Sequence, residues 1–457
     1  MKNIEKRNIM NLKQKHLVNL IEENHYSQFR IEFLSLHAYE QSEFFSAIDK
    51  KIRKNLYELL SAQEVARFLE YLNTSDKEFE MIFNELHVNY ASEILEHMAD
   101  DDAVDILNKL SKEQRITLLT LMPKDKSTLL KSLMHYYEDT AGGIMTKEYI
   151  SVPTTMNVDE ALKYIKEKSN YAQMIYVIYA VDANNKLVGV MSLREIIHTD
   201  ADMLISEIMK VNVVQTDIST DQEYIAQTIR DYDLIAIPVV DYQQHLLGII
   251  TVDDILDVME AEANEDYSRL AGIDSVKDTE ESILKTAKKR LPWLILLTFL
   301  GMITATILGS FEETLEQVAL LAAFIPIISG MSGNTGTQSL AVSVRSISTG
   351  DMKHKNKLRH ALYESGSGFI SGFVCSLILF LIIVILYGQP LLATIVAISL
   401  TIAMTVGTTI GSVIPLFMNK IGIDPAVASG PFITTINDIV SMLIYFGLAT
   451  SFMSYLT

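Results

Sequence analysis

The pattern of hydrophobic and polar positions divides the chain into two parts near residue 291. Before this point, apolar residues recur in short groups separated by charged and polar turns, whereas after it they form long, nearly uncharged stretches. A membrane-spanning helix needs about 20 such residues. We therefore predict a transmembrane domain at 292–457 whose five helices lie at 292–309, 317–342, 361–387, 391–417 and 428–454.

Short stacked helices are predicted for the first 136 residues. Apolar pairs such as Ile94-Leu95, Ile106-Leu107 and Leu118-Leu119 recur about every 12 residues, with polar turns between them. This spacing is typical of a small all-α superhelix in which each helix packs only against its neighbours. We assign residues 1–136 to such a domain.

A second repeat fills residues 137–262, in two units at about 137–200 and 201–262. Segments rich in β-branched residues predict strands, and a hydroxyl residue before each acidic pair predicts a helix N-cap. The landmarks recur with an offset of 59 residues, and they are Asp182, Gly189 and Ser192 in the first copy and Asp241, Gly248 and Thr251 in the second.

The two copies resemble a tandem pair of CBS domains, an α+β regulatory module that we place at 137–266. The resemblance implies an adenine nucleotide as a ligand of the pair, with the motif Thr251–Asp254 at the ribose. The first copy departs from the pattern, because it has Glu195 where an Asp is usual.

The formal net charge of −19 lies almost entirely in the soluble part. Only 7 of the 57 acidic and 6 of the 38 basic residues follow Leu291, which leaves 50 acidic and 32 basic residues before it, a net charge of −18. An acidic domain argues against nucleic acid as a partner, which needs a basic face, and favours a cation. The single Cys375 excludes an intrachain disulfide and a Cys-based metal site.

Basic residues near the spans predict the orientation in the lipid bilayer. They cluster at 285–290, at 345–359 and at Lys420. The other connections between the predicted spans contain no Lys or Arg. Because basic loops stay in the cytosol, five spans place the N-terminal domains inside the plasma membrane and the C-terminus outside. The first residues lack an apolar segment of signal-peptide length, which fits this orientation.

Asp438 is the candidate functional residue of the spans. It lies near the middle of the last span, where a carboxylate costs roughly 2.5–3.5 kcal/mol, and Thr434 shares its helix face. An all-oxygen neighbourhood suits a hard cation that keeps its water, as Mg²⁺ does. The alternative is a structural Asp that is neutral or paired with a basic side chain, although no span contains Lys or Arg at a matching depth.

The second span contains small polar residues at 329–339, among them Asn334 and Thr335. Amides and hydroxyls at these positions line a wet path in one interpretation. In the other, the glycines among them allow a tight seam between helices. Both interpretations stay open.

Four strings resemble the MgtE family of Mg²⁺ channels over nearly the whole length: AGGIMT at 141–146, TVDDILDVMEAEANED at 251–266, GNTGTQS at 333–339 and DPAVASGPFITTINDI at 424–439. The resemblance implies a homodimer with a pore on its axis, lined by the second and fifth spans. There, Asp438 of each subunit holds a hydrated Mg²⁺. Residues 267–291 would form a long linker, or plug, helix before the first span. The candidates for lining the pore are Asn334, Thr335, Gly430, Thr434 and Asn437, and at Gly430 some family members carry a polar residue instead.

Acidic residues of the soluble part predict a cation sensor. Residues 253–266 contain seven acidic residues and no basic one, and two carboxylates about 5 Å apart repel by roughly 3 kcal/mol at an effective dielectric constant near 20. A divalent cation between such groups reverses the sign, which predicts a compact state with Mg²⁺ and a splayed state without it. The alternative is a solvated acidic face. The family resemblance implies that the regulatory ligands are Asp101, Asp105, Asp221, Glu223, Asp233, Asp254, Glu262, Glu265 and Asp266.

These observations together predict a Mg²⁺-selective uptake channel that is closed by cytosolic Mg²⁺. A divalent transporter coupled to H⁺ or Na⁺ is the alternative, and a CBS sensor without transport would need neither Asp438 nor a polar span. An enzyme is not expected, because the ten His residues show no metal-hydrolase spacing and no Gly-rich phosphate loop is present. The sequence does not separate Mg²⁺ from Mn²⁺, Co²⁺ or Ca²⁺, since all accept oxygen ligands.

Overall fold

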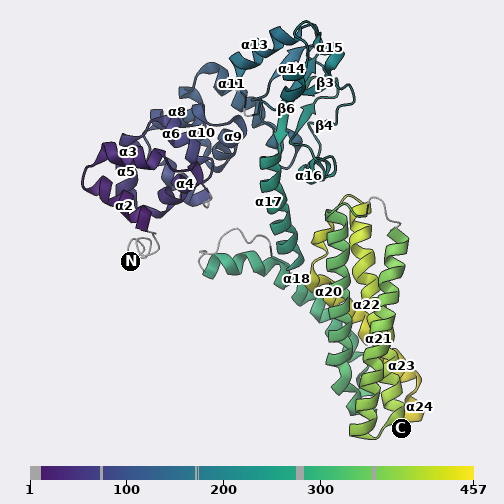
Figure 1. The fold of residues 1–457 in the computed structure, drawn as a ribbon. Helices are drawn as coiled ribbons and strands as arrows, with labels where there is room; N and C mark the ends of the chain where they lie inside the picture. The colour runs from purple at the N-terminus through teal and green to yellow at the C-terminus, as the bar shows by residue number, and fades with distance from the viewer. Residues whose placement is uncertain are drawn as a thin grey trace. The chain divides into compact units, whose positions relative to one another are not determined.

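The computed structural model describes residues 12–72, 76–169, 172, 174–273, 283–352 and 357–456. It divides into two compact units, Met1–Val258 and Met259–Thr457, which are both drawn in Figure 1. Helix α17 (Val252–Leu270) contains the division between them. The multidomain architecture predicted from the sequence is confirmed, with helices first, an α+β pair next and long apolar helices last.

Short helices joined by tight turns begin the first unit (Figure 1). Several begin at a polar N-cap, where the side chain of Asp49, Ser61 or Ser111 accepts a hydrogen bond from the backbone of the first turn. The helices are α2 (Leu12–Glu22), α3 (Tyr26–Leu34), α4 (Ala38–Ala47), α5 (Lys50–Leu59), α6 (Ala62–Leu69), α7 (Asp76–Phe83), α8 (Val88–His97), α9 (Asp100–Lys109), α10 (Lys112–Leu121), α11 (Lys124–Leu133) and α12 (Ala141–Ile144).

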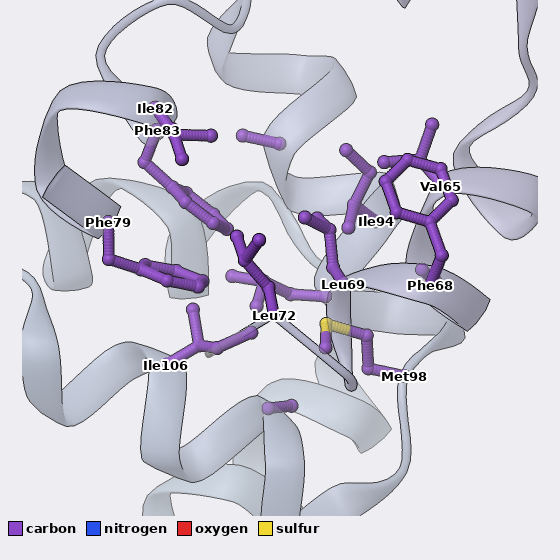
Figure 2. Close-up of a cluster of buried hydrophobic side chains, with 14 of the residues drawn as sticks. Val65, Phe68, Leu69, Leu72, Phe79, Ile82, Phe83, Ile94, Met98 and Ile106 are labelled. Atoms are coloured by element: carbon purple, nitrogen blue, oxygen red, sulfur yellow. The ribbon is translucent and has the colours of Figure 1, made fainter. Parts of the chain in front are cut away.

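Apolar side chains from these helices form one continuous core, part of which is shown in Figure 2. Phe68 of α6, Ile94 of α8 and Ile106 of α9 are all buried in it. The same cluster extends through Ile225 and Ile237 into the second copy of the α+β repeat. The predicted superhelix is present, but its core does not end at the predicted domain boundary.

The repeat at 137–262 folds as two copies of one α+β unit. In each copy a three-stranded sheet pairs its first strand parallel to the second and its second strand antiparallel to the third. The first copy contains β1 (Ser151–Pro153), α13 (Val158–Lys168), β2 (Val177–Val181), β3 (Leu187–Ser192) and α14 (Leu193–His198). The second contains α15 (Ile205–Ile208), β4 (Thr216–Asp217), α16 (Gln222–Asp231), β5 (Ala236–Val240), β6 (Leu246–Thr251) and the start of α17.

The 59-residue offset extends to the backbone of the turns. Asn185 and Gln244 hold equivalent positions and both have positive φ, 61° and 70°. In each turn the preceding aspartate, Asp182 or Asp241, accepts a backbone N–H bond of 2.8 Å. The internal repeat inferred from the sequence is therefore confirmed in its local geometry.

Within its described residues, the second unit contains five helices that are long and apolar enough to cross a membrane. These candidate spans are Thr286–Gly309, Ala319–Ser348, Lys357–Tyr387, Pro390–Lys420 and Gly430–Ser451, which agree with the predicted ranges within a few residues at most ends. The elements are α18 (Ile283–Gly309), α19 (Glu312–Gln317), η1 (Ala319–Phe324), α20 (Ile325–Ser348), α21 (Lys357–Tyr387), α22 (Pro390–Lys420), η2 (Pro425–Val427), α23 (Gly430–Ser451) and α24 (Met453–Leu456).

The two ends of the predicted linker helix at 267–291 belong to different helices, α17 and α18. Helix α17 ends at Leu270, where Gly272 takes a φ of 70° that L-residues rarely adopt, and α18 begins at Ile283. The part of this prediction at 274–282 lies outside the described residues.

Helix α22 is the most enclosed of the candidate spans. Of the residues in its apolar stretch 56% are buried, whereas none are buried in the apolar stretch of α18. Glycines bring α22 against α20. A Cβ added at Gly411 would lie 2.2 Å from the carbonyl oxygen of Gly336. Small residues allow such close approach of helices in membranes. The polar stretch of the second span therefore packs partly as a seam.

Candidate cation sites

Helix α23 positions Asp438 two turns from its start. The helix begins at Gly430 with Pro431 in its first turn, where proline needs no hydrogen-bond donor. The half-buried Asp438 carboxylate accepts a hydrogen bond from the Ser329 hydroxyl of α20. No basic side chain lies near this carboxylate among the described residues. The interpretation of Asp438 as one half of an ion pair thus finds no partner in the described part of the chain.

Two further pore-lining candidates, Thr434 and Gly430, precede Asp438 on α23. Thr434 is half-buried, and its hydroxyl donates to the carbonyl oxygen of Gly430 at 2.9 Å, which leaves the hydroxyl oxygen able to accept. A Cβ added at Gly333 of α20 would lie 2.8 Å from the Thr434 methyl group. Gly430, also half-buried, offers only its backbone here.

The two pore-lining candidates of the second span differ in exposure. Asn334 is exposed, while the half-buried Thr335 donates to the carbonyl oxygen of Met331 at 3.1 Å. Asn437 of the last span is fully buried, and its side-chain amide donates to the carbonyl oxygen of Ser332 at 3.3 Å. The structure therefore places Asn437 inside the helix bundle and away from any open surface of this chain.

A second group of carboxylates gathers in the first unit, where α9 meets the start of α17. Burial, and then the nearby Asp254 carboxylate, raises the pKa of Asp101 to about 8. Burial, and then Asp101, raises the pKa of Asp102 to about 9. The pKa of Asp254 is raised by burial to about 6, although the Thr251 hydroxyl donates to it. The electrostatic interaction of Asp101 with Asp254 links two residues that are far apart in sequence.

One lysine partly balances this group. Lys126 Nζ lies 2.8 Å from Asp100 Oδ1 and 4.0 Å from Glu148 Oε1. Asp100 is 1% exposed, and its Oδ2 has no hydrogen-bond partner among the described residues. Burial, followed by the Asp100 charge, raises the pKa of Glu148 to about 7. Burying several carboxylates beside one cation is unfavourable without further positive charge.

Sequence reasoning missed Asp102 and Glu148 in this group. Asp102 lies within the ADDD turn at 99–102, and Glu148 follows the AGGIMT string by two residues. Each residue lies beside a residue or string that the sequence analysis had already singled out, and this proximity was the available signal. Neither string, taken alone, shows that the side chains converge with Asp254.

The other predicted regulatory residues of the first unit are more open. Asp105 is exposed. Asp221 is exposed and caps α16 by accepting the N–H of the half-buried Glu223 at 2.9 Å. Asp233 is exposed and has a φ of 51°. No group of three or more His, Cys, Asp or Glu side chains in the described residues is arranged to hold a metal ion, so this chain contains no preformed cage in its described part.

The remaining three predicted ligands belong to the second unit, on the last turns of α17. Glu262 is half-buried. Asp266 accepts a hydrogen bond of 2.8 Å from Ser348 at the end of α20, and burial raises its pKa. Glu265 pairs with Arg269, which also pairs with Asp424. The sequence analysis did not identify this link between the end of α17 and the turn before α23.

Family models match three parts of the chain. A model described as the MgtE intracellular N domain matches residues 36–139, CBS domain models match 141–202 and 205–261, and a divalent cation transporter model matches 325–448. The magnesium transporter MgtE of Enterococcus faecalis is 43% identical over 439 residues, which cover 96% of this chain and 97% of that protein. The chain belongs to the MgtE family of magnesium transporters.

Two other MgtE transporters support this membership. The Bacillus subtilis protein is 37% identical and covers 95% of this chain, with 96% of its own length matched. The Thermus thermophilus protein is 36% identical over 76% of this chain and 78% of its own length. As a member of the family, the chain is a membrane transport protein and not an enzyme.

Solved structures match the soluble part. The crystal structure of the soluble part of a magnesium transporter has a TM-score of 0.53 and 41% identity, and covers 55% of this chain and 98% of its own. The cytosolic domain of the Mg²⁺ channel MgtE in complex with ATP has a TM-score of 0.51 and 33% identity, and covers 54% and 99%. The helical domain and CBS pair are thus shared with these proteins.

Proposed function

We propose that this transporter is a channel that admits Mg²⁺ past Asp438 and closes when cytosolic Mg²⁺ occupies the acidic groups. The observation that carries the proposal is the Asp438 carboxylate, which is half-buried in a candidate span, held by a hydroxyl, and without a basic neighbour among the described residues. A cation that passes along α23 would supply the missing positive charge.

The proposed permeating species is hydrated Mg²⁺. Asp438 and Thr434 offer only oxygen atoms, and Mg²⁺ sheds its water reluctantly, so these groups would accept hydrogen bonds from its hydration shell. In the proposed homodimer, the carboxylates of two copies face the ion together. The membrane potential contributes about 2.3 kcal/mol per charge per 100 mV toward entry.

The proposed sensor uses the half-buried carboxylates around Asp101 and Asp254. Their mutual repulsion opposes the packing of α9 on α17, and a divalent cation between them would favour it. We propose the same role for the open groups of the second CBS copy and for those at the end of α17, acting with cations or with the second subunit. These are Asp105, Asp221, Glu223, Asp233, Glu262, Glu265 and Asp266.

We propose that the N-terminal domains are cytosolic and that the C-terminus is outside. Arg290 lies in α18 near its start, Lys357 begins α21, and Lys420 ends α22. Alternating passage through the membrane would place these basic residues on one side. Lys353 and Lys355, which belong to the same predicted cluster, lie outside the described residues.

An adenine nucleotide is proposed as a second ligand of the CBS pair. CBS domain models match both copies, and the similar cytosolic domain was solved in complex with ATP. The Thr251 hydroxyl already donates to Asp254 within the chain, so ribose binding there would compete with this bond. Calorimetric titration of the full chain with ATP tests the proposal, and it fails if no heat of binding is found.

Electrical recording in a planar bilayer tests the main proposal. A Mg²⁺ current through the parent protein should reverse at the Mg²⁺ equilibrium potential, and millimolar Mg²⁺ on the cytosolic side should reduce it. A reversal potential that moves with the H⁺ or Na⁺ gradient would instead establish coupled transport. A protein that binds Mg²⁺ but carries no current would contradict the channel.

A further inference from the structure

Asn437 lies next to Asp438 on α23, at the meeting of α20, α22 and α23, and is fully buried. Its amide nitrogen fills a space that two glycines leave open. A Cβ added at Gly336 of α20 would lie 2.0 Å from Asn437 Nδ2, and one added at Gly407 of α22 would lie 3.4 Å from it. The seam therefore has room for this side chain because position 336 lacks a Cβ, whereas a Cβ at position 407 would collide with Ser332, 2.7 Å from its carbonyl oxygen.

Two hydrogen bonds connect α23 to α20 at this level. The Ser329 hydroxyl of α20 donates to Asp438, and the Asn437 amide of α23 donates to the carbonyl oxygen of Ser332 at 3.3 Å. Ser329 and Ser332 are one turn apart on α20, whereas the two α23 residues are consecutive. Because consecutive side chains leave a helix about 100° apart, the two bonds together restrict the rotation of α23.

Packing and hydrogen-bond satisfaction alone do not require an amide here. The carbonyl oxygen of Ser332 also lies 3.1 Å from the Thr335 hydroxyl, whose single proton it shares with the carbonyl oxygen of Met331. The Asn437 Oδ1 has no hydrogen-bond partner in the described part of the chain. A buried acceptor without a partner is unfavourable, and an apolar side chain of the same shape would avoid that cost.

We propose that Asn437 is a positioning residue, which fixes the rotation of α23 and so aims the Asp438 carboxylate at the permeating cation. This rests on the proposed role of Asp438. Asn437 then acts on conduction through its neighbour, without touching the cation. A rotated carboxylate would still attract cations, but it would lose its fixed distance to the ion and so discriminate less between divalent cations of different size.

The test is Asn437→Leu in the full-length chain reconstituted in liposomes. Leucine has a similar shape and removes both the donor and the unpartnered acceptor, so thermal stability should stay near that of the parent. Mg²⁺ influx should fall about tenfold, the loss expected for one interhelical hydrogen bond at the upper end of the measured range in membranes. The ratio of Mg²⁺ to Ca²⁺ influx should fall as well, which a general loss of folded protein would not cause.

The matched control is Ser399→Ala in α22. Ser399 is also fully buried, and its hydroxyl has no partner among the described residues. Influx and the Mg²⁺ to Ca²⁺ ratio should stay at the parent values in this variant. If Asn437→Leu does not fold, the smaller Asn437→Ser, whose hydroxyl is too short to reach Ser332, is judged by the same two measurements.

Parent-like influx and ion ratio in a folded Asn437 variant would overturn the positioning role. An equal loss of Mg²⁺ and Ca²⁺ influx would also overturn it, because the effect would then be structural. A parent protein without Mg²⁺ influx would instead contradict the proposed function, which separates the two failures.

Discussion

The two units of this protein treat carboxylates in opposite ways. In the membrane unit, Asp438 stands alone on its helix, with a single hydroxyl of α20 as its described partner. In the first unit, Asp101, Asp102 and Asp254 lie near one another, and burial together with neighbouring carboxylates raises the pKa of each. An isolated carboxylate attracts a cation. In a group of neighbouring carboxylates, like charges repel one another, and a cation bound between them would reduce this repulsion.

This contrast gives opposite expectations for removing one charge. Without its only carboxylate, the membrane site loses its attraction for cations. The crowded site becomes less strained when one carboxylate is removed, because each remaining group has fewer like charges nearby. Four variants or conditions test this difference, beginning with the one of largest expected effect.

Asp438→Asn should reduce Mg²⁺ influx by about 100-fold, since the loss of about 3 kcal/mol of charge interaction corresponds to that factor. Influx into liposomes measures it. Glu313→Gln, which removes an exposed carboxylate of the same unit, should keep the parent influx. If both variants conduct like the parent, Asp438 has no part in permeation.

Asp101→Asn should make the first unit more compact without Mg²⁺ and less responsive to it. We expect protease resistance in EDTA to increase and the Mg²⁺ concentration for half-protection to rise about tenfold, which corresponds to about 1.4 kcal/mol of lost cation binding. Limited proteolysis over a Mg²⁺ series measures both. Asp125→Asn, an exposed carboxylate on α11, is the control, and an equal shift in that variant would assign the effect to net charge.

Raising the pH should destabilise the first unit in EDTA. The pKa values of Asp101, Asp102 and Glu148 are raised in the folded state to about 8, about 9 and about 7, above unfolded values of about 4. The folded state therefore binds more protons in this window, and stability falls from about pH 4 to pH 9. Thermal unfolding followed by circular dichroism should show a lower Tm at pH 8.5 than at pH 6.0, and millimolar Mg²⁺ should reduce the difference. A Tm that rises with pH in EDTA would contradict the crowded site.

The smallest effect is expected at the link between α17 and the turn before α23. Arg269→Glu should break the ion pair with Asp424 and shift the Mg²⁺ dose for closure by a few-fold, because a half-exposed pair contributes about 1 kcal/mol at most. Flux over a cytosolic Mg²⁺ series measures the shift. The double variant Arg269→Glu with Asp424→Arg restores the pair with position 424 but leaves Glu265 beside a like charge, so it should reverse part of the shift. No reversal at all would mean that the pair with Asp424 does not couple the two segments.

The features that were predictable from the sequence are those encoded locally. Hydropathy located the spans because a bilayer imposes length and apolarity on each segment separately. The offset between Asp182 and Asp241 revealed the repeat because the same turn needs the same capping residue twice. Asp438 was noticeable because a charge in an apolar stretch is rare.

What the sequence could not give depends on tertiary packing. The predicted pore-lining residue Asn437 is buried because glycines on α20 and α22 leave space on that side of α23, and a helical face alone does not show which neighbour it meets. Glu148 joins Asp100 through Lys126 of α11. Such convergence depends on how helices from different parts of the chain pack.

The continuous core of the first unit has a consequence for how this protein comes apart. Leu133 of the last superhelical turns, Met145 of the connecting segment and Ile237 of the second CBS copy belong to one apolar cluster, while Val152 of the first copy belongs to another. Dividing the chain after residue 136 would expose apolar side chains of this cluster on both fragments. The helical domain and the second CBS copy should therefore melt in one cooperative step. The first copy is tied to the second by a different apolar cluster, in which Tyr179 and Leu187 pack with Leu246, so its unfolding should follow that step closely.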